Sequence, residues 1–115
     1  MRDRALPLVN EIDSVGLMDR IAAGEDILLV DIRTPAEIVQ AAIPKAVYIP
    51  MHLLPLRMNE LPRDKDVVLY CRSGARSYHA CQYLAQQGFD KAINLRGGII
   101  AWARHGFEIE PGRPD

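Results

Sequence analysis

Four short apolar runs recur along the chain at regular spacing, and they constrain the fold more than any other feature. They begin at residues 27, 46, 67 and 92. The first and third are continuously apolar, which is typical of strands covered on both faces. Helix-compatible segments fill the gaps, and such alternation predicts βαβ units. The sequence therefore predicts an α/β fold with an open, mainly parallel sheet and helices on both faces.

Helix start and stop signals lie between these runs. Residues 34–37 (Thr-Pro-Ala-Glu) are typical of an N-cap, a first-position proline and an acidic first turn. Pro55 interrupts the stretch 51–61, which predicts a loose turn and then a short helix from about Leu56. The strongest helical pattern carries a buried stripe that includes Ser77 and Cys81. We expect helices over residues 13–24, from 34 onward, from about 56, over 74–87 and over 99–104.

The length fits a single domain of ordinary size. With 115 residues and 49% hydrophobic side chains, one core can form without a disulfide or a metal. The formal net charge of -1 argues against a general nucleic-acid binder. No apolar run approaches the ~20 residues that span a bilayer, and residues 1–10 hold no signal-type apolar segment. We expect a cytoplasmic, single domain over residues 1–115, with its core at about 12–107 and a flexible tail at 108–115.

A cysteine follows the third apolar run, where open parallel sheets gather their reactive groups. The N–H groups of the following helix, its dipole and a tight loop at Gly74 would stabilise an anion at Cys71. Together with Arg72 and Arg76, such surroundings lower a cysteine pKa from about 8.5 into the range of about 3.5 to 7.5. A lone cysteine after a buried strand is more often an apolar filler. The polar, basic segment that follows Cys71 favours a nucleophile instead.

Four blocks of the sequence, in the same order, resemble the rhodanese family of single-domain sulfurtransferases. They are residues 31–37, 43–50, 70–77 and 95–102, and the resemblance covers about residues 12–107. It implies that Cys71 is the nucleophile, which carries sulfur as a persulfide. It also implies a loop whose backbone N–H groups hold that sulfur and its donor, formed by Arg72, Ser73, Gly74, Ala75 and Arg76.

Two features qualify the resemblance. Family members usually have Gly-His-Ile-Pro-Gly-Ala where this chain has AAIPKA at residues 41–46. Lys45 leaves the conformation of that turn open, because a positive φ is costly for residues other than glycine. Related phosphatases and arsenate reductases have five residues between their cysteine and arginine, whereas four separate Cys71 from Arg76. The shorter loop favours a single sulfur atom over a tetrahedral phosphate.

The remaining candidates have supporting or structural roles. Cys81 lies too far along the same helix for a disulfide to Cys71, so we expect it in the core. Asp31 and Arg33 end the first apolar run at the same sheet edge, where we expect an ion pair beneath the loop, with direct substrate contact as the alternative. We expect no metal site and no cofactor, because ligand spacing is lacking at His52, His79 and His105.

We therefore predict a sulfurtransferase that moves sulfane sulfur from a donor such as thiosulfate to a thiophilic acceptor through Cys71. The acceptor would be cyanide, a thiol or a protein cysteine, and neither nucleic acid nor a membrane is an expected partner. One alternative is a non-catalytic rhodanese module that binds a partner through the same loop, which the intact Cys71 and Arg76 disfavour. The other is a thiol redox or phosphatase enzyme, which the missing resolving cysteine and the four-residue gap disfavour.

Overall fold

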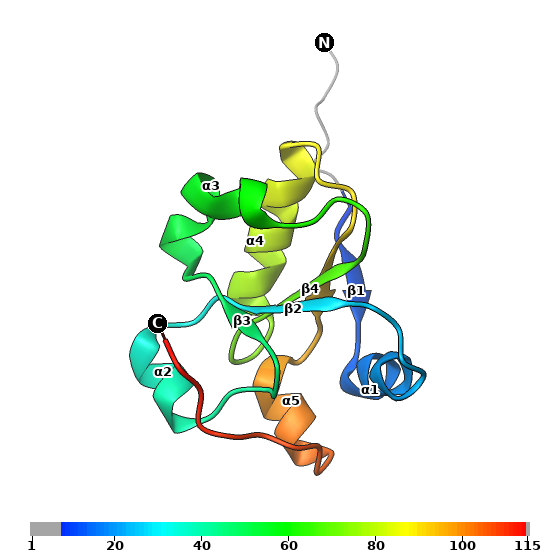
Figure 1. Ribbon diagram of the computed structural model, residues 1–115, viewed down its shortest axis with the longest axis vertical. Helices are drawn as coiled ribbons and strands as arrows, with labels where there is room; N and C mark the ends of the chain where they lie inside the picture. Colours follow the sequence, from blue (N-terminus) through cyan, green and yellow to red (C-terminus); the bar gives the residue numbers. More distant parts are fainter. Residues whose placement is uncertain (1–7, 115) are drawn as a thin grey trace.

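A five-stranded sheet forms the centre of the molecule (Figure 1). The structure is a computed structural model, which describes residues 8–114. All strand pairs are parallel, and the order across the sheet is β1-β5-β4-β2-β3. The predicted α/β fold is therefore confirmed. The strands are β1 (Asn10–Ile12), β2 (Leu28–Asp31), β3 (Val47–Tyr48), β4 (Val67–Tyr70) and β5 (Ala92–Leu95).

The four apolar runs form β2 to β5, while β1 was not predicted. β1 has three residues, of which Asn10 and Glu11 are exposed and only Ile12 is half-buried. It has no apolar run, and it forms by pairing with β5, from Asn10 against Ile93 to Ile12 against Leu95. A strand that depends on such distant pairing leaves little local signal in the sequence.

Helices cover both faces of the sheet, as the ribbon shows for α3 and α4 on one side and α1 and α5 on the other (Figure 1). Asp13 caps α1 by accepting a hydrogen bond from the Gly16 N–H, and Thr34 and Glu37 form the capping box of α2. The helices are α1 (Ser14–Ala22), α2 (Pro35–Gln40), α3 (Leu54–Arg57), α4 (Ala75–Gln86) and α5 (Gly98–Arg104), with 3-10 turns at Met51–Leu53 and Met58–Glu60. No helix within residues 8–114 is long and apolar enough to cross a bilayer.

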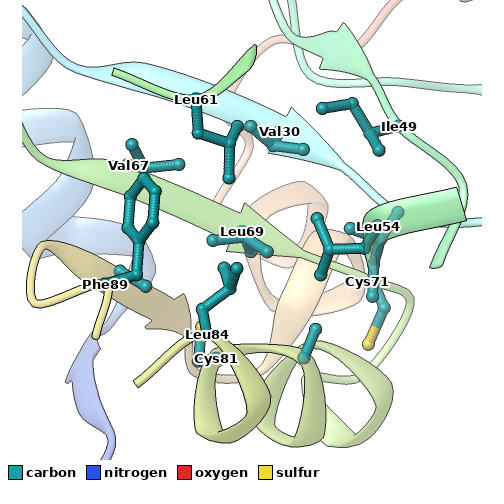
Figure 2. Close-up of a cluster of buried hydrophobic side chains, with 13 residues drawn as sticks. Val30, Ile49, Leu54, Leu61, Val67, Leu69, Cys71, Cys81, Leu84 and Phe89 are labelled. Carbon is teal, nitrogen blue, oxygen red and sulfur yellow. The ribbon is translucent and has the colours of Figure 1, made fainter. Parts of the chain in front are cut away.

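Strand β4 runs through the middle of the core and positions the residue after it. Its four side chains are fully buried and alternate between the two faces of the sheet. Val67 and Leu69 pack toward α3 and α4, whereas Val68 and Tyr70 pack toward α1 and α5. Cys71 continues this alternation and joins the cluster under α4 (Figure 2).

One expectation about the chain's local structure was wrong, and a second concerns the end of the chain. Helix α3 begins at Leu54, so Pro55 lies in its first turn, where a proline sacrifices no helical hydrogen bond. The segment expected to be a flexible tail, residues 108–115, makes backbone contacts as far as Gly112, Asp115 lies outside the described residues, and its flexibility stays a prediction. Glu110 forms a two-way backbone bridge with Ala42, and the Gly112 N–H donates to the Ile38 carbonyl over 2.9 Å.

The turn that departs from the family pattern keeps a glycine-like conformation. Lys45 has a φ of +69°, in the left-handed region that glycine adopts without cost. The Ala46 N–H donates to the Ile43 carbonyl across this turn. Lys45 therefore holds a conformation that is costly for a residue with a side chain.

Candidate active site

The loop after β4 places Cys71 at the carboxyl edge of the sheet, between the strand and the first turn of α4. Its backbone passes close to the start of α5, and this requires glycine at Gly74, which has a φ of +100°. A Cβ at Gly74 would lie 3.1 Å from the Gly97 nitrogen and 3.3 Å from the Leu95 oxygen. The expected tight loop at Gly74 is therefore present, and the connection between β5 and α5 packs directly against it.

The first turn of α5 fixes the carbonyl groups of the same loop. The Ile99 N–H donates to the Cys71 carbonyl over 3.0 Å, and the Ile100 N–H donates to the Arg72 carbonyl over 3.1 Å. A Cβ at Gly98 would collide with the Arg72 carbonyl, so glycine is needed for this approach. Because the carbonyls are bound by α5, the N–H groups of the loop remain available on its other side.

Those N–H groups converge on the sulfur of Cys71, a residue that is 1% exposed. The Gly74 N–H donates to Sγ over 3.1 Å, and the Ser77 N–H and hydroxyl lie 3.4 Å from it. Burial on its own would raise the pKa of Cys71. Hydrogen bonds from the Ser77 hydroxyl and from the N–H groups of Ser77, Gly74 and Ser73 outweigh burial and lower that pKa below its usual value.

Ser77 belongs to this site, although sequence reasoning assigned it only to the buried stripe of the helix. It is fully buried on α4, one turn beyond Gly74. Its hydroxyl also lies 2.5 Å from the Asn94 side-chain oxygen on β5, and the Asn94 amide donates to Glu11 on β1. A hydroxyl inside an otherwise apolar stripe, shortly after a candidate nucleophile, is the signal that could have identified it.

Arg76 forms an ion pair that the sequence did not predict. Its guanidinium donates to both carboxylate oxygens of Glu37, over 2.9 and 2.8 Å. These bonds hold the pKa of Glu37 at about 2, well below its usual value. We expected Arg76 to act on the sulfur by its charge, but that charge is shared with a carboxylate from α2, and the thiolate is stabilised mainly by hydrogen bonds. Both α2 and the loop begin at the carboxyl edge of the sheet, which could have suggested the pairing.

Asp31 and Arg33 form a buried ion pair at the end of β2. The Arg33 side chain donates to the Asp31 carboxylate over 2.6 to 3.1 Å, and the same guanidinium donates to the Ala41 carbonyl. It also lies 5.6 Å from the centre of the Tyr70 ring. The pair thus ties β2 to the residue that precedes Cys71, an arrangement suited to the supporting role that we predicted.

Two hollows flank the Glu37–Arg76 pair. One, of about 200 Å³, is lined by Arg33, Glu37 and Arg72 together with apolar side chains of α5. The other, of about 230 Å³, lies beside Arg76 and is lined by residues that include Tyr48 and Met51. Arg72 is exposed at the edge of the first hollow. Guanidinium groups therefore line both hollows beside the loop.

Cys81 has a different environment from Cys71. Both cysteines are free thiols, and Cys81 faces the core from the middle of α4, where burial raises its pKa to about 12 (Figure 2). The prediction that Cys81 is a core residue without a disulfide is confirmed. In the part of the chain that the structure describes, His, Cys, Asp and Glu side chains form no group of three able to hold a metal ion.

Comparison with known proteins places this arrangement in a family. A sulfurtransferase of Allochromatium vinosum is 68% identical over 102 residues, which cover 89% of this chain and 95% of the relative. The Bacillus subtilis protein YtwF is 43% identical over 94 residues, which cover 82% of this chain and 90% of the relative.

Solved structures have the same fold. A rhodanese-like domain protein from Staphylococcus aureus superposes with a TM-score of 0.79 at 31% identity, over 89% of this chain and 99% of the other. A rhodanese-related protein from Thermoplasma volcanium superposes with a TM-score of 0.80 at 29% identity, over 88% and 97%. The family model described as the rhodanese-like domain matches residues 15–105, which include every block of the predicted resemblance. The chain therefore belongs to the family of rhodanese-like domains.

Proposed function

We propose that this protein is a sulfurtransferase that moves sulfane sulfur from a small anionic donor such as thiosulfate to a thiophilic acceptor. One observation carries the proposal: three donors, the Gly74 N–H and the N–H and hydroxyl of Ser77, surround the Cys71 sulfur. Such a ring stabilises a thiolate and, equally, the anionic persulfide that follows it. The 68% identity to a protein named sulfurtransferase supports the same activity.

The first half-reaction loads the sulfur. The Cys71 thiolate attacks the outer sulfur of thiosulfate, so a bond forms from Sγ to that sulfur while the donor's S–S bond breaks. Sulfite leaves with the electron pair of the broken bond, and the negative charge of the thiolate passes to the outer sulfur of the persulfide. Arg72 at the edge of the loop attracts the doubly charged donor. Arg76 attracts it less strongly, because its charge is partly compensated by Glu37.

The second half-reaction unloads the sulfur. An acceptor thiolate or cyanide attacks the outer sulfur of the persulfide, and Cys71 leaves as a thiolate. No proton moves in either step if the cysteine is already ionised, so the site needs no general base. This fits a loop in which hydrogen bonds, rather than a histidine, act on the sulfur.

The test is an intact-mass measurement after incubation with thiosulfate. We expect wild type to gain one sulfur atom, which cyanide or a thiol removes. Cys71→Ala should lose both this gain and thiosulfate:cyanide sulfurtransfer, whereas Cys81→Ala keeps both and serves as the matched control. A Cys71→Ala protein that is folded and still transfers sulfur would contradict the proposal.

A further inference from the structure

The Ser77 hydroxyl has one proton and two acceptors. Its oxygen lies 2.5 Å from Asn94 Oδ1 and 3.4 Å from Cys71 Sγ. A hydroxyl donates a single hydrogen bond at a time. Ser77 and Asn94 are at most 1% exposed. Asn94 and Cys71 therefore compete for the same proton.

The orientation of the Asn94 amide is fixed by its other contacts. Its nitrogen donates to a Glu11 carboxylate oxygen over 2.9 Å and to the Gly74 carbonyl over 3.2 Å. Both partners only accept hydrogen bonds, so turning the amide over would place its oxygen against two acceptors. Asn94 must therefore present its oxygen to Ser77. Because an amide oxygen cannot donate, the proton between the two side chains belongs to Ser77.

The charge on the sulfur decides which acceptor receives this proton. While Cys71 is a neutral thiol, its sulfur is a weak acceptor, and the amide oxygen of Asn94 binds the hydroxyl better. Once Cys71 has released its proton to solvent, the sulfur is an anion, and a hydrogen bond to an anion is about twice as strong as a neutral one. The hydroxyl then turns toward Sγ by rotation about its C–O bond, and no covalent bond changes.

We propose that Ser77 is a two-position switch, whose hydroxyl donates to Asn94 when the Cys71 sulfur is neutral and to that sulfur when it is an anion. Asn94 is thereby a positioning residue that acts on the nucleophile through Ser77. The inference rests on the proposed function, since it concerns the sulfur that we assign as nucleophile.

Other charged and titratable groups near the sulfur do not take part in this competition. Arg76 faces Cys71 from α4 and is paired with Glu37, and Cys81 lies farther along the same helix. On β1, Glu11 lies beyond Asn94, with Arg96 4.0 Å from its carboxylate. The substitutions used in the test leave all of these groups in place.

The test is a double-mutant cycle on the pH midpoint of Cys71 alkylation, which is resolved from Cys81 by peptide mass. Ser77→Ala should raise the midpoint by about one unit or more, because a hydrogen bond to the thiolate is lost. Asn94→Leu removes the competing acceptor and should lower the midpoint by about half a unit. In the Ser77→Ala background, Asn94→Leu should leave the midpoint unchanged. An Asn94→Leu shift of the same size in both backgrounds would overturn the switch, since it would show that Asn94 acts without the hydroxyl.

A measurement on the wild-type side chain covers the case in which a variant fails to fold. The side-chain amide signals of Asn94 in NMR spectra should move with the same pH midpoint as Cys71 alkylation, and most of this movement should vanish in Ser77→Ala. Amide signals that stay still while Cys71 titrates would refute the switch. Neither measurement uses a sulfur donor, so a failure of the switch is distinguishable from a failure of sulfur transfer.

Discussion

Glu37 offers a way to remove one contact of the active loop without disturbing its helix. Its carboxylate binds the Arg76 guanidinium through two hydrogen bonds and also closes the capping box with Thr34. Glutamine serves at the same capping position. Glu37→Gln therefore removes the charge and keeps the cap, so the change in stability reports on the ion pair.

The magnitude follows from the pKa of Glu37, which the Arg76 hydrogen bonds hold at about 2 against an ordinary 4.5. At 1.36 kcal/mol per unit this corresponds to at most about 3 kcal/mol of folding free energy. The Arg76 side chain is 41% exposed, so solvent screening reduces the expected loss to about 1–2 kcal/mol at pH 7. The folded-state pKa is lowered, so this stability is present above pH 4.5 and disappears as the pH falls toward 2.

The assay is urea unfolding at several pH values, followed by the fluorescence of Trp102, which is the only tryptophan and is buried. The difference between wild type and Glu37→Gln should be largest at pH 7 and should shrink below pH 4.5. Glu60→Gln is the matched control. It breaks an ion pair with Arg57 in which both side chains are exposed, so it should change stability little. A loss that is the same at pH 7 and pH 3, or an equal loss in Glu60→Gln, would refute the reasoning.

Two further predictions concern the backbone and use the same unfolding assay. Gly98→Ala should cost more than about 2 kcal/mol and slow Cys71 alkylation, because its Cβ meets the Arg72 carbonyl at a φ of +59°. Gly24 has a φ of +79° and no atom near its Cβ position, so Gly24→Ala should cost only the strain of the left-handed conformation, about 1–2 kcal/mol, and leave alkylation unchanged. Equal effects of the two substitutions would argue against the close approach at Gly98. Lys45→Gly should stabilise the protein by about 0.5–1 kcal/mol by relieving a φ of +69°. Lys45→Ala keeps the Cβ and should bring no gain, so a gain in both would point away from the turn.

The sequence predicted those parts of the fold that depend on local patterns. Examples are the buried runs of β2 and β4, the capping signals at Thr34 and the long helical pattern of α4. Each of these patterns depends on burial or on residues nearby in the chain, and not on which segment packs against it. β1 was missed because it has no such pattern and exists through pairing with β5. The bridge between Glu110 and Ala42 was missed for the same reason.

The candidate site divides in the same way. Cys71 and Gly74 are close in the chain, so their spacing in the sequence was enough to predict that they lie in one loop. Glu37 meets Arg76 across 39 residues, and Asn94 meets Ser77 across 17. Glu37 was explained locally as an acidic residue in the first turn of a helix, and Asn94 as a strand residue. The contacts that give them a role at the sulfur exist only once the strands are ordered.

The sheet order has a consequence for protein synthesis. Glu11 on the first strand accepts a hydrogen bond from Asn94, 83 residues later, and the Cys71 carbonyl accepts one from the Ile99 N–H. A chain emerging from the ribosome therefore lacks the segments that support the Cys71 loop, β5 and the start of α5, until almost all of the domain has been made. Pairing over such long separations forms late, because loop closure must precede it. The hydrogen bonds that lower the pKa of Cys71 would thus form only in the last stage of folding, after the rest of the sheet is in place.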